Sequence, residues 1–179
     1  MDERTAQLIA AALEAGFSHA GPLDPATLEP MKEVREMCAA DKCRRYGKCW
    51  ACPPGCGPLE ALAEQMKGYS RGILVQTVVQ LEDSFDFEGM MEGEAAHTRA
   101  FEAFAETCRA VEPDCMPLGA GTCMRCETCT YPDAPCRFPD KVFPSMEASG
   151  LLVTEVCKRN GMAYHHGANT VTYTSCCLF

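Results

Sequence analysis

The stretch RGILVQTVVQL, Arg71 to Leu81, is rich in β-branched residues and gives the strongest strand prediction in the chain. Side chains branched at Cβ favour the extended backbone of a strand, where they pack well against neighbours on the pleated surface. The segments before and after this strand show whether it belongs to a sheet covered by helices.

Segments with helical and extended patterns alternate on both sides of this strand. Apolar residues at helical spacing predict helices over residues 2–15, 58–66, 93–111 and 145–160. Further strands are expected over residues 17–23, 115–120 and 170–179. The acidic segment 83–93 contains two glycines and is predicted to be a loop. We therefore expect a single α/β domain over residues 1–179, with one central sheet flanked by helices.

Cysteine usage is the most unusual feature of the composition, with 14 cysteines among 179 residues. The chain begins without a basic and apolar secretory signal, and no apolar run is long enough to span a bilayer. We therefore expect a cytoplasmic protein whose thiols serve metal or redox chemistry, since disulfides are rare there. The net charge of −9 argues against a nucleic-acid partner.

The second cysteine-rich loop, residues 121–139, reads GTCMRCETCTYPDAPCRFP. Cys123, Cys126 and Cys129 follow the spacing C-x2-C-x2-C, and Cys136 adds a fourth thiol between two prolines. Three thiolates at successive steps of three can each meet a different iron of a cubane cluster, as in ferredoxin-type sequences. A zinc site more often uses two separated C-x2-C pairs. The spacing therefore favours a [4Fe–4S] cluster, with zinc as the alternative.

The first cysteine-rich loop, residues 38–58, holds enough thiols for a second four-ligand site with one to spare: Cys38, Cys43, Cys49, Cys52 and Cys56. The basic residues among them either form a solvated loop, compensate the charge of a cluster or dock an acidic partner: Lys42, Arg44, Arg45 and Lys48. Tyr46 and Trp50 either pack as core aromatics or shield a cluster from water. We expect both loops at one edge of the sheet.

The remaining thiols and histidines give weaker signals. Cys108 and Cys157 lie in helical patterns and are expected to be core residues, while Cys115 could be either core or ligand. Adjacent side chains on a strand point to opposite faces, so one of Cys176 and Cys177 could reach a cluster or a substrate pocket. The pair His165-His166 is expected to be solvated or structural rather than catalytic, and no catalytic residue is assigned.

Six short motifs resemble the family of predicted metal-binding proteins known as domain of unknown function 2284, which occurs mainly in anaerobic bacteria and archaea. The motifs are VREMC (34–38), CRRYGK (43–48), WACPP (50–54), CMRCETC (123–129), PCRFP (135–139) and SMEASG (145–150). The resemblance implies a first site with Cys38, Cys43 and Cys52. It implies a second site with all four thiols of the second loop. Cys49, Cys56 and Cys176-Cys177 go beyond the family pattern, and any of them could be the fourth ligand of the first site.

Three functions are compatible with these residues. The first is a protein with one or two [4Fe–4S] clusters that transfers electrons to or from a partner enzyme. The second is an enzyme in which a first site of only three thiolates leaves one iron open to substrate or to sulfur transfer. The third is a structural or metal-carrying zinc protein. We expect no membrane partner, and the sequence does not specify an oligomeric state.

Overall fold

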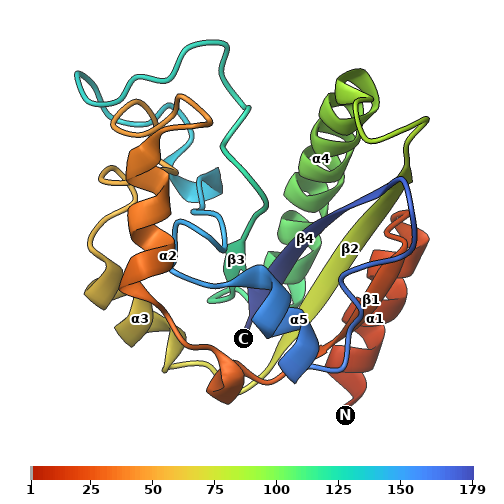
Figure 1. The fold of residues 1–179 in the computed structure, drawn as a ribbon. Helices are drawn as coiled ribbons and strands as arrows, with labels where there is room; N and C mark the ends of the chain where they lie inside the picture. The colour runs from red at the N-terminus through yellow and green to blue at the C-terminus, as the bar shows by residue number, and fades with distance from the viewer. Residues whose placement is uncertain (1) are drawn as a thin grey trace.

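The computed structural model describes residues 2–179, and its centre is an antiparallel sheet (Figure 1). In the described residues the sheet has four strands in the order β1-β2-β4-β3. Their bounds are His19–Leu23 (β1), Gly72–Gln80 (β2), Met116–Leu118 (β3) and Thr170–Leu178 (β4). The strand predicted from RGILVQTVVQL is β2, which pairs with β1 on one side and along its whole length with β4 on the other. The four strand predictions are therefore confirmed.

Helices cover both faces of this sheet, which confirms the predicted mixed α/β fold. The α-helices of residues 2–179 are α1 (Glu3–Glu14), α2 (Lys32–Met37), α3 (Leu59–Met66), α4 (Phe87–Val111) and α5 (Val153–Arg159). One core cluster joins α1 and α4 to the sheet, and a second joins α3 and α5 to its other face. Among these helices, none has the length and apolar character that crossing a membrane requires.

The alternation of side chains along β2 and β4 builds these two cores. Ile73 and Val75 face the core of α1 and α4, whereas Leu74 between them faces the core of α3 and α5. The adjacent thiols of β4 divide in the same way, with Cys177 on the α1/α4 face and Cys176 on the α3/α5 face. Both are fully buried. Each buried side chain of the size of valine, leucine or isoleucine contributes about 1.5–3 kcal/mol to the free energy of folding, so both faces stabilise the sheet.

Segment 83–93, predicted as a loop, instead contains the first two turns of α4, which begins at Phe87. Asp86 caps the helix by accepting a hydrogen bond of 2.8 Å from the backbone N–H of Gly89. Gly93 lies where α4 crosses the sheet, and a Cβ there would stand 2.7 Å from Cγ2 of Val79. The two glycines therefore serve a cap and a close packing contact, and they do not end the helix.

The helix predicted over 145–160 is shorter than expected, because only Val153–Arg159 is helical. Residues 145–150 form a series of turns that ends at Gly150, whose φ of +76° a side chain rarely adopts. The turns are fixed to the edge of the sheet, since the N–H of Met146 donates to the carbonyl of Gly119 at 2.9 Å. As a result Glu147 lies in a turn and not in a helix, and its side chain faces the first cysteine loop.

Gly93→Ala should destabilise the protein although alanine is the better helix former. The added methyl group would press on Val79 and Tyr173, and such overpacking costs about 1–3 kcal/mol. The helix preference of alanine over glycine recovers only about 1 kcal/mol. Chemical denaturation measures the free energy of unfolding, with Ala96→Gly at an exposed position of α4 as the calibration for helix preference. A more stable Gly93→Ala protein would contradict the packing argument.

Candidate metal centre

The two cysteine-rich loops, far apart in sequence, come together at the end of the molecule that carries α2 and the edge strand β3 (Figure 1). Cys49, Ala51 and Cys52 of the first loop are buried, and Cys123 and Cys129 of the second loop pack against them. The hydroxyl of Thr122 lies 3.2 Å from Sγ of Cys52 and adds a polar link between the loops. The contact surface between the loops is therefore made largely of thiols.

Five thiols line one pocket in this region, and we call it the thiol pocket. All four thiols of the second loop contribute, together with one from the first loop: Cys123, Cys126, Cys129, Cys136 and Cys49. The structure thus brings together the set predicted from C-x2-C-x2-C and Cys136. It also places Cys49, which the sequence grouped with the first loop, beside the second.

Arginine side chains surround the thiol pocket and supply positive charge. Arg45, Arg125 and Arg137 line it. Arg137 donates a hydrogen bond of 2.8 Å to the carbonyl of Thr128, and Nε of Arg125 lies 3.3 Å from Glu102. Nη2 of Arg125 is buried and has no hydrogen-bond acceptor among residues 2–179. A buried donor without a partner costs about 1–3 kcal/mol, so a negatively charged group in the pocket would be stabilised by it.

Contacts among the thiols favour a thiolate at Cys49. Cys123 and Cys52 direct hydrogen bonds at Cys49, which lowers the pKa of the Cys49 thiol well below its usual range. The same interaction raises the pKa values of Cys52 and Cys123, with burial adding to the effect. Metals bind thiolates rather than thiols. Of these three thiols, Cys49 therefore loses its proton first, and Cys52 and Cys123 keep theirs to higher pH.

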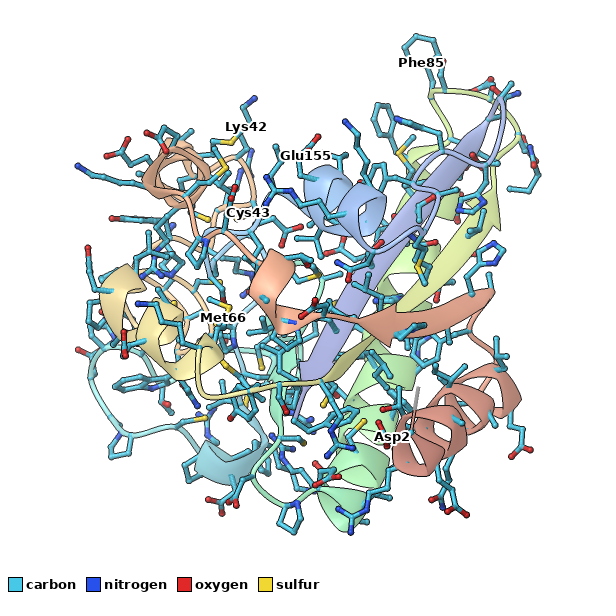
Figure 2. The ribbon with its side chains drawn as sticks, turned by 90° about the horizontal axis from the view of Figure 1, so that it is seen from below. Asp2, Lys42, Cys43, Met66, Phe85 and Glu155 are labelled. Atoms are coloured by element: carbon cyan, nitrogen blue, oxygen red, sulfur yellow. The ribbon has the colours of Figure 1, made fainter. Side chains whose placement is uncertain are left out.

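Three other thiols of the first loop face a different space. Cys38, Cys43 and Cys52 line a cleft of about 450 Å³ between this loop and α5. In Figure 2, Lys42 and Cys43 lie on one side of this region and α5, with Glu155, on the other. Burial raises the pKa of the Cys38 thiol. Cys56 is instead packed against the core of α3 and α5.

Four of the five thiols outside both loops are buried core residues, and Cys115 is half-buried against the core of α1 and α4. Cys157 and Cys176 lie in the core of α3 and α5, and Cys108 and Cys177 lie in that of α1 and α4. The predictions for Cys108 and Cys157 are therefore confirmed. Neither Cys176 nor Cys177 lines the thiol pocket or the cleft, so the structure does not realise the possibility that one of them reaches a site. Their burial follows from the central place of β4 in the sheet.

The aromatic, basic and histidine residues singled out from the sequence have distinct places. Trp50 lines the thiol pocket, stacks edge-on with Tyr131 and donates a hydrogen bond of 3.2 Å to the carbonyl of Ala134. Arg45 also lines this pocket, whereas Lys42 and Tyr46 line the cleft. Lys48 lies 4.0 Å from Asp41 in a surface ion pair, and Arg44 is exposed.

His166 stacks on His19 with 4.6 Å between ring centroids, and the ring of His165 packs edge-on against Tyr164. Neither lines the thiol pocket or the cleft. His165 is thus placed by packing within its own segment, whereas His166 contacts His19 of β1 and lies 3.3 Å from Oε1 of Gln76 in β2.

Sequence reasoning missed the acidic wall of the cleft. Glu94 comes from the part of α4 that faces the second loop, and Glu147 comes from the turns after β3. Glu147 stands inside the motif SMEASG, but the helix predicted there gave no reason to direct its carboxyl at the first loop. The charge of this wall depends on contacts between segments that are distant in sequence.

A family model described as "Predicted metal-binding protein (DUF2284)" matches residues 21–179. The chain belongs to this family. The match covers both cysteine loops and all the strands beyond the first residues of β1. The chain matches no curated protein and no solved structure. Metal binding is thus the property that the family description assigns, and the cysteine-rich loops supply ligands suited to it.

The donor set fits a thiophilic metal centre. Thiolates select zinc, copper(I) or iron–sulfur clusters over hard cations such as magnesium and calcium. In the region that the structure describes, no three His, Cys, Asp or Glu side chains are placed so that they could hold a single metal ion. The candidate centre is therefore the thiol pocket as a whole, with its thiols and the arginines around them.

Cys49→Ser should change the pH titration of the thiols in reduced, chelator-treated protein. The lowered pKa of Cys49 keeps one thiolate at pH values where ordinary thiols are protonated. Its removal should abolish the thiolate ultraviolet absorbance that persists on acidification. Cys157→Ser serves as the control, because burial raises the pKa of that thiol. If Cys49→Ser and the unmodified protein had the same thiolate absorbance throughout the acidic pH range, the assignment of the thiolate to Cys49 would be contradicted.

Proposed function

We propose that this protein is an iron–sulfur protein in which Cys123, Cys126, Cys129 and Cys136 hold a [4Fe–4S] cluster that exchanges electrons with a partner protein. The observation that carries the proposal is that these four thiols line one pocket together with three arginines. Four thiolates complete the ligation of a cubane, so such a cluster carries electrons without an open iron. The guanidinium groups would offset its negative charge.

The surroundings of the thiol pocket support electron exchange with another protein. Met124, beside a ligand of the cluster, is 51% exposed, and Phe138, two residues after Cys136, is 43% exposed. Exposed apolar side chains such as these two would be available for contact with a partner protein. The cluster would therefore lie close to a docking surface, which shortens the path for an electron.

Anaerobically isolated protein should contain iron and acid-labile sulfide in equal amounts, roughly four of each per cluster. It should give an electron paramagnetic resonance signal on reduction. Cys129→Ser should lose most of this iron because it removes one of four proposed ligands. Cys157→Ser, a core thiol outside both loops, should keep it. Protein with zinc alone would contradict the proposal, and so would a Cys129→Ser variant with unchanged iron and spectrum.

A second candidate function is supported by the place of Cys49. Because Cys49 lies with the second loop, the cleft is left with Cys38, Cys43 and Cys52. These three thiols would hold a second cluster and leave one iron accessible from the cleft. Such an iron supplies Lewis-acid chemistry for a substrate. The protein would then be an enzyme that receives electrons through the second loop.

Cys56→Ser distinguishes this open centre from a fully ligated one. Cys56 is the remaining first-loop thiol, and it lies against the core rather than in the cleft. We expect its substitution to leave the iron content and the spectrum unchanged. Loss of one cluster in Cys56→Ser would show that Cys56 completes the first site and would exclude the open centre. Cys38→Ser, which removes a proposed ligand, is the positive control.

A further inference from the structure

The cleft beside the first cysteine loop has the size and lining of a site for a small organic molecule. Its volume is about 450 Å³, room for roughly ten to fifteen non-hydrogen atoms. Most of its lining is apolar, with contributions from α2, the turns before α5 and the start of α5 itself. The apolar lining residues include Val34, Met37, Ala148, Leu151, Leu152 and Val153. Apolar walls do not stabilise a bare ion, whereas they stabilise a bound hydrocarbon group by removing its surface from water.

One polar group in this lining lacks a partner. Oε2 of Glu147 is shielded from solvent and has no hydrogen-bond donor within the described chain. Buried carboxylate oxygens are normally paired, and an unpaired one is costly. Glu147 lines the cleft, so rotation of its carboxyl group would bring this oxygen to a donor carried by a ligand. Burial raises the pKa of the Glu147 carboxyl, so a positively charged donor in the cleft would favour its charged form.

A second carboxylate stands near the first. Glu94 reaches the cleft from α4, where its Oε1 lies against the backbone of Gly121, and a Cβ on that glycine would come within 2.6 Å of it. The absence of a side chain at Gly121 therefore leaves the space that Glu94 occupies. Lys42, a basic residue of the lining, is exposed, so water solvates its charge. The interior of the cleft is acidic.

Two aromatic rings complete the lining. Tyr46 comes from the first loop and Tyr164 from the segment after α5. The faces of tyrosine rings attract ammonium and guanidinium groups. Carboxylates, aromatic faces and apolar walls within one cleft are a combination that suits an organic cation with a hydrocarbon part.

We propose that this cleft binds a small organic amine, whose ammonium group pairs with Glu147 and Glu94 and whose hydrocarbon part lies against α2 and the start of α5. The amine would sit beside Cys38, Cys43 and Cys52, which names a substrate class for the cleft. The binding step itself does not depend on which metal the thiols hold. It can therefore fail while the proposed electron-transfer function stands, and the reverse also holds.

Calorimetric titration of the anaerobically isolated protein with hexylamine, hexanol and hexanoate tests this proposal. Hexylamine should bind most tightly, because the three probes share a chain and differ in the charge of the head group. Glu147→Gln should weaken hexylamine binding at least tenfold, about the loss expected for a charge-assisted hydrogen bond, and leave hexanol unchanged. Glu155→Gln, at a carboxylate of α5 outside the cleft, is the matched control and should bind as the unmodified protein does.

A second variant keeps the test decisive if Glu147→Gln does not fold. Leu152→Ala shortens an apolar wall at a half-exposed position and should weaken hexylamine binding several-fold while leaving ethylamine nearly unchanged. Equal affinities for the amine, the alcohol and the carboxylate would overturn the proposal. Hexylamine binding unaffected by both Glu147→Gln and Leu152→Ala would overturn it too. Iron and sulfide measured on the same samples report separately on the cluster.

Discussion

Contacts among Cys49, Cys52 and Cys123 hold together two loops that contain little regular secondary structure. The sheet and its helices have their own cores, whereas the loops meet through a small cluster of thiols, one alanine and one valine, and through the contacts of Trp50 with Tyr131 and Ala134. Such a small apolar contact contributes little stability by itself. Metal binding by thiolates, which is assigned to the family, would add the stabilisation that this contact lacks. A metal bound by these thiols would therefore stabilise the contact between the two loops.

The backbone fold was largely predictable because its strands and most helices are encoded by local patterns. Repetition of β-branched residues predicted β2, and the spacing of apolar residues predicted α1. The errors fell where a local signal had two meanings. Gly89 and Gly93 indicated a loop, yet one accommodates the cap of α4 and the other a contact with Val79. Such contacts come from segments distant in sequence, and single-sequence patterns carry no record of them.

The sequence indicated which thiols form the candidate site, but it did not predict how they group in space. The spacing of the second loop already collected the four thiols that share the thiol pocket. The sequence did not predict that Cys49 of the first loop lines the same pocket as the thiols of the second loop, because this position follows from how the loops pack. The acidic cleft was equally hidden, because Glu94 and Glu147 are ordinary surface residues by sequence and converge only in the fold. In the proposed function, the thiol pocket would serve electron transfer and the cleft would bind a ligand.

X-ray absorption spectroscopy at the iron and zinc edges of anaerobically isolated protein tests the central claim most directly. A cluster held by the second loop predicts an iron edge with sulfur neighbours and an additional iron–iron scattering path, because a cubane places several irons close together. This path should disappear from the second-loop centre in a Cys129→Ser protein. A zinc edge with four sulfur neighbours at about 2.3 Å and no iron would show a single-ion site and would contradict the account.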